Sequence, residues 1–417
     1  MVTNKIISVI GLGYIGLPTA VMLASKGCMV NGVDTNPLVI DSINSGVAHI
    51  DEPGLGIELN KQINSGKMRA YSHPVESDIY IIAVPTPFIS GYKADLSYVD
   101  QAINSIATVL KPGDLIIIES TSPVGTTLRI RDIVINRRPD LNCSEEGVAS
   151  SQVDINIAYC PERVLPGKIM EELTSNDRIV GGLTSQCSKK AKDLYQIFVQ
   201  GDIHITDSKT AELAKLTENS YRDVNIAFAN EVSMICDDLQ INTNELIRLA
   251  NKHPRVKILE PGVGVGGHCI AIDPWFIVES APGRAKIIKL ARQVNIEKTQ
   301  WVYDKILTEK NSINKKFVRI GIMGLAFKPD VGDLRESPAL DIVLKLALNK
   351  DIKIILSEPN IYKLPTEFNN LNICLDNSIN ALDDVDILIS LVKHKEFISV
   401  IKNHKGNKII DFCGLLK

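Results

Sequence analysis

The sequence contains no paired-cysteine motif. Its eight cysteines, at positions 28, 143, 160, 187, 236, 269, 374 and 413, show no CxxC pair and no regular spacing. In a chain of 417 residues, this absence argues against a disulfide framework and against a zinc cluster. Most of these cysteines are expected to be small buried hydrophobes. We therefore expect a cytoplasmic protein without a bound metal.

Long apolar runs and an excess of one charge are also missing. No apolar run reaches the ~18 residues that a membrane span needs. The apolar segment Ile6–Ile10 runs straight into glycines and lacks the basic start and cleavage site of a signal peptide. The formal net charge is only −3, so any phosphate site must be local. We expect neither a membrane nor a nucleic acid as a partner.

The chain is longer than one hydrophobic core normally allows, so two or three domains are expected. Apolar strands alternate with helical patterns in the first half, which is typical of βαβ units and a mostly parallel sheet. The polar stretch 142–154 is predicted to be a surface loop. The predicted strands of the first half are Ile6–Ile10, Met29–Val33, Ile79–Val84, Leu115–Glu119 and Asn156–Tyr159.

The middle of the chain is predicted to be helical. Ala211–Gln240 has no proline or glycine, and Arg284–Leu307 has a similar pattern. Such a region commonly joins domains or forms a dimer interface. The strand–helix rhythm then returns with predicted strands at Val318–Met323, Ile352–Ser357, Ile387–Val392 and Lys408–Phe412. We expect an α/β fold with two Rossmann-like parallel-sheet domains, 1–204 and 311–417, joined by a central helical region, 205–310.

A dinucleotide-binding fingerprint stands near the N-terminus. Gly11, Gly13 and Gly16 form a GxGxxG motif after a predicted strand and before a helix-like segment, Pro18–Ser25. The glycines permit a tight turn and close approach to a pyrophosphate, which the helix N-terminus attracts. Asp34 ends the next strand, where a carboxylate binds ribose hydroxyls and repels a 2′-phosphate. These features predict NAD as the cofactor.

Two threonines follow later strands of the same sheet. Thr86 lies in the AVPTP segment and Thr121 in the ESTSP segment. Ligands bind at the carboxyl ends of strands in such sheets. Either threonine is a candidate cofactor contact or an ordinary turn hydroxyl.

Cys269 ends a glycine-rich run that begins at Gly262. Glycines allow unusual backbone angles and close approach of a ligand. If the run leads into a helix or a nest of N–H groups, the thiolate would be favoured. Taken alone, the sequence leaves a nucleophile and a buried structural thiol about equally supported. Asp273, four residues later, favours a functional site over a structural thiol because its carboxylate could position water.

Three polar residues recur on one face of the first long helix. Lys215, Asn219 and Arg222 are spaced at i, i+4 and i+7. A solvated polar stripe is the usual explanation for this spacing. The alternative is that ammonium and amide groups stabilise negative charge on oxygen in a cleft.

Further charged residues occur in predicted loops. Glu162 could position water, and Arg163 could bind a phosphate or carboxylate. Lys328 and Arg335 follow the first strand of the last domain and could attract an anionic ligand. His253 and Arg255 form another cationic pair before the cysteine run. The alternative interpretation is that they simply lie in a surface turn.

Seven segments of the chain resemble those of a known family. The segments GLGYIGLPTA, AVPTPF, ESTSPVGTT, CPERVLPG, AELAKLTENSYRDVNIAFANE, GVGVGGHCIAIDPWF and GLAFKPDVGDLRES are similar, in order, to those of the UDP-glucose/GDP-mannose dehydrogenase family. Within it, PERVLPG, KHPRV and GGHCIAIDPWF most resemble the members that oxidise UDP-N-acetyl-D-mannosamine. Members that oxidise UDP-glucose have a second glutamate about where Pro166 stands.

The resemblance implies an N-terminal NAD domain, a central dimerisation region, a C-terminal UDP-sugar domain and a role in polysaccharide biosynthesis. It implies that Cys269 is the nucleophile and that Lys215 and Asn219 stabilise oxyanions. It also implies that Asp273 orients water and that Glu162 activates it. The implied cofactor contacts are Tyr14, Ile15, Asp34, Thr86, Thr127 and Arg335. The implied substrate contacts are Arg163, Val164, Lys215, Asn219, Arg222, His253, Arg255, Gly266, Phe327 and Lys328, with His253 and Arg255 reaching into a partner subunit of a homodimer or larger homo-oligomer.

The implied reaction is a four-electron oxidation of the primary alcohol of a UDP-sugar to a uronic acid, with UDP-N-acetyl-D-mannosamine as the expected substrate. The same chemistry on UDP-N-acetylglucosamine or UDP-glucose is one alternative. A two-electron hydroxyacid dehydrogenase, which needs no cysteine, is another. One position departs from the family, because Cys413 stands where relatives carry a basic residue.

Overall fold

The computed structural model describes residues 5–89, 91–145, 153–403 and 408–416. It divides into two compact units, Met1–Thr217 and Glu218–Lys417. The division falls within one long helix, α8 (Ser208–Asp238). The predicted domain boundaries at 204/205 and 310/311 stay a prediction.

The first unit is built on an eight-stranded sheet with the strand order β10-β9-β8-β7-β4-β1-β2-β3. Strands β8, β7, β4, β1, β2 and β3 run parallel to one another, while β9 pairs antiparallel to β8 and parallel to β10. The strands are β1 (Ile6–Ile10), β2 (Met29–Val33), β3 (Met68–Tyr71), β4 (Ile79–Ile82), β7 (Leu115–Ile118), β8 (Asn156–Tyr159), β9 (Arg178–Gly182) and β10 (Ile203–Asp207).

The parallel register brings several loops to one edge of this sheet. Ile10 at the end of β1 pairs with Val33 and with Ile82, and Ile82 pairs with Ile118. The segments that follow these strands therefore begin side by side. They carry the glycine fingerprint, Asp34, Thr86 and Thr121.

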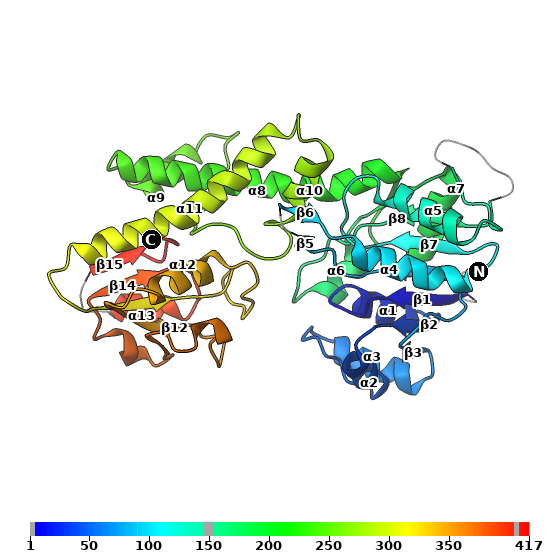
Figure 1. Cartoon of the computed structure of the whole chain (residues 1–417), viewed down its shortest axis with the longest axis horizontal. Coiled ribbons are helices and arrows are strands. Elements are labelled where there is room, and N and C mark those ends of the chain that lie inside the picture. The colour runs from blue at the N-terminus through cyan, green and yellow to red at the C-terminus, as the bar shows by residue number, and fades with distance from the viewer. Residues whose placement is uncertain (1–4, 90, 146–152, 404–407, 417) are drawn as a thin grey trace. The chain divides into compact units, whose positions relative to one another are not determined.

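Helices cover the sheet because its central strands are apolar on both sides. Alternate residues of β7 enter separate cores, with Leu115 and Ile117 in one and Ile116 and Ile118 in the other. The remaining elements of this unit are α1 (Gly16–Ser25), α2 (Pro37–Asn44), α3 (Leu55–Asn64), β5 (Phe88–Ile89), β6 (Lys93–Ala94), α4 (Ser97–Ile106), η2 (Ala107–Val109), α5 (Thr126–Arg137), α6 (Ile169–Ser175) and α7 (Ser185–Tyr195) (Figure 1).

The second unit combines helices with a five-stranded parallel sheet of order β13-β12-β11-β14-β15. Its elements after α8 are α9 (Thr243–Ala250), α10 (Asp273–Ser280), α11 (Lys286–Asn311), β11 (Val318–Met323), α12 (Pro338–Ala347), β12 (Ile352–Ser357), η3 (Thr366–Phe368), β13 (Ile373–Leu375), η4 (Ile379–Leu382), β14 (Ile387–Ser390), α13 (Phe397–Asn403) and β15 (Lys408–Asp411).

Buried polar contacts join α8 to α11 in this unit. Asp223 on α8 accepts hydrogen bonds from Arg292 and Asn295 on α11, both at 2.7 Å. Asn295 in turn accepts from Asn230 on α8, at 2.9 Å. All four residues are buried, so each polar group needs its partner there.

The predicted α/β fold, with two parallel-sheet domains and a helical middle region, is confirmed. Several predicted ends are wrong by two residues. For example, β4 ends at Ile82 rather than Val84, since Val84 already belongs to the loop before Pro85 and its carbonyl accepts the hydroxyl of Ser120. The helix predicted at 211–240 begins earlier, at Ser208. Of the loop predicted at 142–154, residues 146–152 lie outside the described part.

Candidate active site

The glycine fingerprint forms a turn with no room for side chains at two of its three positions. Gly11 has a φ of +90°, and a Cβ there would lie 2.7 Å from the carbonyl oxygen of Ala83. A Cβ at Gly16, where α1 begins, would lie 1.8 Å from the carbonyl oxygen of Gly11. Gly13 is exposed, with open space where its Cβ would be. The turn thus leaves its outer side and the N-terminus of α1 open to a pyrophosphate.

Asp34 holds this turn while remaining at the surface. Its Oδ2 accepts the N–H of Leu12 and its Oδ1 accepts the N–H of Asn36, both at 2.9 Å. The residue is half-buried. A carboxylate can accept about four hydrogen bonds, so ribose hydroxyls fit alongside these two. Tyr14 and Ile15 lie in the same turn, between Gly13 and Gly16, and this donor and acceptor set fits NAD.

The two predicted threonine contacts are brought together. The hydroxyl of Thr86 donates to the backbone carbonyl of Thr121 at 2.5 Å. Both residues are half-buried. The bond links the loops that follow β4 and β7, so it shapes the sheet edge where a cofactor would lie.

Thr127 has a different environment. It is fully buried, and its hydroxyl and backbone N–H both donate to Glu212, at 2.6 and 2.8 Å. Glu212 also accepts the N–H of Gly125 at 2.6 Å. A carboxylate at these N–H groups stabilises the N-terminus of α5. The role of Thr127 as a cofactor contact stays a prediction.

Glu162 takes part in a buried charge network. Its carboxylate forms an ion pair with Arg178 of β9 and accepts the N–H of Arg163 at 2.7 Å. Arg178 also lies 3.6 Å from Glu119, which directly follows β7. Burial raises the pKa of Glu119 to about 7, and the charge of Arg178 opposes this increase. One buried guanidinium therefore compensates two carboxylates, and it fixes the Glu162 loop to the sheet.

The next two residues of this loop are also fixed by the fold. The guanidinium of Arg163 donates to the carbonyl oxygen of Asp177 at 2.5 Å, and Val164 packs against the core of the first unit.

The polar face predicted on α8 exists. Lys215 is half-buried, Asn219 is buried and Arg222 is exposed. Because they lie one and two turns apart on one continuous helix, they share a face.

Cys269 lies in the turn before α10 and is exposed. Its carbonyl oxygen accepts the N–H of Ile272 at 3.0 Å and that of Asp273 at 2.8 Å. Asp273 is buried, and its carboxylate accepts the side-chain amide of Asn219 at 2.5 Å. The structure thus connects Asn219 of α8 to Asp273, whose backbone N–H bonds to Cys269. The sequence predicted the helix face and the cysteine segment separately.

The glycine run before Cys269 packs closely against α11 and against the segment between β11 and α12. A Cβ at Gly264 would lie 2.3 Å from the hydroxyl of Thr299. At Gly266 it would lie 2.4 Å from the carbonyl oxygen of Glu336 and 2.8 Å from Cβ of Phe327. At Gly267, with a φ of +80°, it would lie 2.8 Å from the Phe327 ring. These glycines are required because backbone packs directly on backbone and ring.

The predicted contacts of the C-terminal domain lie beside this run. The carbonyl of Arg335 accepts the N–H of Gly267 at 3.0 Å, and its guanidinium forms a two-point ion pair with Asp333. Lys328 places its ammonium 5.5 Å from the centre of the Phe327 ring.

His253 and Arg255 are both exposed in the turn after α9. The ring Nδ1 of His253 accepts the N–H of Arg255 at 3.3 Å.

Two groups of described residues place possible metal ligands within 4.8 Å of one another. They are Asp177, Asp202 and His204, and Asp330, His394 and Glu396. Neither group includes a residue that the sequence predicted for the site. None of the helices among the described residues combines the length and apolarity that a membrane crossing requires.

Comparison with known proteins identifies the family. Three family models match in succession, the UDP-glucose/GDP-mannose dehydrogenase NAD binding domain at residues 5–199, the central domain at 209–297 and the UDP binding domain at 321–417. The chain belongs to the UDP-glucose/GDP-mannose dehydrogenase family. This confirms the prediction of an NAD-dependent UDP-sugar dehydrogenase.

Individual relatives match over nearly the whole chain. UDP-N-acetyl-D-mannosamine dehydrogenase of Campylobacter jejuni is 52% identical, covering 98% of this chain and 99% of the relative. An NDP-N-acetyl-D-galactosaminuronic acid dehydrogenase of Ralstonia nicotianae is 48% identical, covering 97% and 95%. The solved structure of UDP-D-ManNAc dehydrogenase from Pyrococcus horikoshii has a TM-score of 0.85 at 38% identity, covering 99% and 96%.

Sequence reasoning missed three residues that hold the site loops. Arg178 and Glu119 form the buried network around Glu162, and Glu212 caps α5. A weak signal existed for each, because Arg178 is a charge within an apolar strand, Glu119 ends another, and Glu212 lies beside the Lys215 face. Their pairing depends on contacts between residues far apart in the chain.

The glycine run provides a test of this packing. Gly266→Ala is expected to destabilise the fold by about 1–3 kcal/mol, as overpacking does, and to lower dehydrogenase activity strongly. Gly262→Ala is the matched control, since a Cβ there would meet only one atom, at 3.9 Å. Thermal unfolding and NADH production measure both effects. Equal behaviour of the two variants would contradict the close packing.

Proposed function

We propose that this enzyme oxidises UDP-N-acetyl-D-mannosamine to UDP-N-acetyl-D-mannosaminuronate in a four-electron reaction with two molecules of NAD. Relatives bearing the name UDP-N-acetyl-D-mannosamine dehydrogenase match at 52% and 50% identity over 98% and 94% of the chain. The observation that carries the mechanism is the connected group of Asn219, Asp273 and Cys269. A two-electron dehydrogenase would have no use for the cysteine.

The N-terminal unit is proposed to bind NAD through the turn at Gly11–Gly16, Asp34, Thr86 and Thr121. Bound NAD supplies the hydride acceptor for both oxidation steps. The Asp34 carboxylate orients a ribose, and the N-terminus of α1 offers N–H groups to the pyrophosphate.

Cys269 is proposed to capture the aldehyde that the first oxidation produces. Its sulfur bonds to the carbonyl carbon, and the carbonyl oxygen becomes the oxyanion of a thiohemiacetal. Lys215 and Asn219 stabilise that charge from one face of α8. The thiol is needed because the bare aldehyde has no alkoxide to expel hydride, whereas the thiohemiacetal has one.

Loss of a second hydride leaves a thioester on Cys269, which water must hydrolyse. Asp273 is proposed to orient that water, because its carboxylate is fixed by Asn219 and lies one helical turn from the cysteine. Glu162 is the other candidate base, and Arg178 fixes its carboxylate. Hydrolysis consumes one water and releases the carboxylic acid and the thiol.

The substrate is proposed to be held by charged and backbone groups. Arg163, Arg222 and Lys328 are suited to the diphosphate, and the backbone of Gly266 is proposed to contact the sugar. Val164 and Phe327 supply apolar contact, and Arg335 is proposed to contact the cofactor. Because the mechanism needs Cys269 as a thiol, we place the enzyme in the reducing cytoplasm.

The four-electron mechanism predicts two NADH formed per sugar. Cys269→Ala is expected to abolish uronic acid formation, and Cys374→Ala, which removes another exposed cysteine, should leave it unchanged. Product analysis by mass spectrometry and NADH absorbance measure this. A stoichiometry of one NADH would contradict the four-electron reaction and favour a two-electron dehydrogenase. Unchanged acid formation by Cys269→Ala would remove the cysteine from the mechanism.

The substrate assignment predicts a preference among UDP-sugars. UDP-N-acetyl-D-mannosamine should give the highest kcat/KM in a panel with UDP-N-acetylglucosamine, UDP-N-acetylgalactosamine and UDP-glucose. The galactosamine sugar is included because the relative from Ralstonia nicotianae carries that sugar acid in its name. A higher kcat/KM for any other sugar would replace the proposed substrate while leaving the chemistry intact.

We further propose a homodimer formed through α8. Large apolar side chains at a seven-residue spacing are exposed along this helix, with Tyr221 at 70%, Phe228 at 52% and Ile235 at 50% exposure. Such a stripe marks an interaction surface. His253 and Arg255, exposed after α9, are proposed to reach the partner's substrate.

Disrupting this stripe is expected to give a monomer. Phe228→Glu should halve the mass measured by light scattering, because a charge would be buried in the interface. The control is Ile57→Glu, which places the same charge at an exposed apolar position on α3. A wild-type monomer, or a dimer that survives Phe228→Glu, would overturn the proposed interface.

A further inference from the structure

The C-terminal sheet repeats the start of the NAD-binding turn. Gly11 after β1 donates its N–H to the carbonyl of Val33 at 2.8 Å, and Gly324 after β11 donates to that of Ser357 at 2.9 Å. Both glycines have a positive φ, +90° and +97°. In both sheets the strands follow the same local order, β2-β1-β4 and β12-β11-β14.

The repeat extends to the carboxylate after the second strand. Asp34 accepts the N–H of Leu12 at 2.9 Å, and Glu358 accepts the N–H of Leu325 at 2.7 Å. In each case the carboxylate also accepts the N–H two residues later, at 2.9 Å in the first sheet and 3.1 Å in the second. Glu358 therefore occupies the position of a ribose-binding carboxylate.

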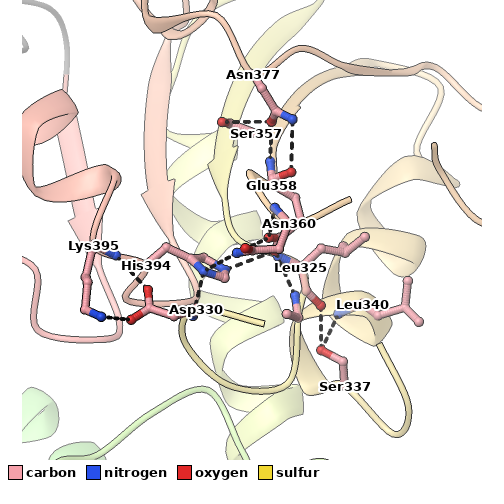
Figure 2. A network of polar contacts seen from close by, with 11 residues as sticks. Leu325, Asp330, Ser337, Leu340, Ser357, Glu358, Asn360, Asn377, His394 and Lys395 are labelled. Carbon is pink, nitrogen blue, oxygen red and sulfur yellow. Dashed lines mark hydrogen bonds and ion pairs between the residues drawn. The ribbon is translucent and has the colours of Figure 1, made fainter. Parts of the chain in front are cut away.

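The two carboxylates differ in what covers them. Asp34 is half-buried, whereas Glu358 is completely buried. Figure 2 shows that the ring of His394 reaches Glu358, with its Nε2 3.1 Å from Oε2. Oε2 also accepts the N–H of Ala326 at 3.0 Å. The imidazole thus takes the place that is open to ribose hydroxyls beside Asp34.

The hydrogen bonds of His394 determine which nitrogen carries its proton. Nδ1 lies 3.0 Å from the backbone N–H of Asp330 and 3.1 Å from the side-chain amide of Asn360. A backbone N–H can only donate, so Nδ1 accepts and Nε2 carries the proton toward Glu358. Burial raises the pKa of Glu358, but hydrogen bonds from His394 and the backbone outweigh it and hold the pKa below its ordinary value.

Together the pair fixes both ends of one loop. The loop begins at Leu325 and Ala326, whose N–H groups bind Glu358, and ends at Asp330, whose N–H binds His394. Asp330 has a φ of +59°, in the left-handed region that costs free energy for any residue except glycine. Its carboxylate is held in turn by the backbone and side chain of Lys395, at 3.1 and 3.0 Å.

This loop carries two proposed substrate contacts and touches the cysteine run. Phe327 and Lys328 lie between the fixed ends, and Phe327 packs against the backbone of Gly266 and Gly267. A shift of the loop would move the ring that defines the position of that run, two residues before Cys269.

We propose that Glu358 and His394 are positioning residues, which fix the 325–330 loop so that Phe327 and Lys328 bind the nucleotide-sugar. The ring of His394 covers the Glu358 carboxylate and prevents it from binding ribose hydroxyls as Asp34 is proposed to do. The C-terminal sheet therefore binds the nucleotide-sugar and not a second dinucleotide. The inference rests on the proposed function only for the identity of the ligand.

Two variants separate the contributions of His394. His394→Asn keeps an acceptor for the N–H of Asp330 but loses the donor to Glu358, and His394→Gln keeps the donor but loses the acceptor. Glu358→Gln removes the charge at nearly equal volume. The control is His204→Asn, which removes an exposed histidine–carboxylate contact, His204 to Asp177, on the first unit.

The experiment measures amide hydrogen exchange of the 325–330 segment, UDP affinity by calorimetry and KM for both substrates. In all three test variants the segment should exchange faster. The Kd for UDP and the KM for the UDP-sugar should rise on the order of tenfold, as for the loss of a hydrogen bond to a charged group. The KM for NAD should stay within about twofold, and His204→Asn should behave as wild type.

Unchanged exchange and UDP affinity in all three variants would overturn the inference. A parallel rise of KM for NAD with a lower melting temperature would also overturn it, because it would indicate only general destabilisation. If the wild-type enzyme does not bind UDP, the proposed function fails, while the exchange measurement still decides whether the pair fixes the loop.

Discussion

The structure around Cys269 depends on one constraint, the absence of space for any side chain between its glycine run and the C-terminal domain. Gly266 and Gly267 lie directly on Phe327 and on the carbonyl of Glu336. The cysteine, α10 and Asp273 follow within a few residues, so their positions depend on this packing. The cysteine that we propose as the nucleophile would need a fixed approach to its substrate. Backbone packing supplies it without long, mobile side chains.

Buried carboxylates hold the loops of both units. Glu162 and Glu119 share Arg178, Glu212 holds the start of α5, and Glu358 holds the loop after β11. Each is compensated by a cation, by N–H groups or by an imidazole, as burial of a charge requires. Buried, compensated carboxylates therefore hold both the proposed cofactor edge of one sheet and the proposed nucleotide-sugar loop of the other. The equivalent carboxylates after the second strands of the two sheets differ in exposure, since Asp34 is half-buried and Glu358 is completely buried.

Much of the fold was predictable from the sequence because its strongest patterns are local. Strand β1 and strand β2 have the predicted bounds, and the fingerprint between them forms the expected turn. The edge strand β10 was missed, since it has only five residues, with two isoleucines, and none of the five is buried. The antiparallel pairing of β8 with β9 was missed as well, because strand direction follows from the path of the chain and leaves no mark in a short segment.

The sequence by itself determined which chemical groups this protein has. The glycine turn, the acid after β2, the Lys215 face and the cysteine run could all be read from spacing, since each acts within one helix, turn or strand end. Only the tertiary structure decided which groups meet. Asn219 forms a hydrogen bond with Asp273, which lies 54 residues away in the sequence. His394 contacts the carboxylate of Glu358, which lies 36 residues away. Such pairs form because separate elements pack together and bury charges that need partners, and no local pattern records that outcome.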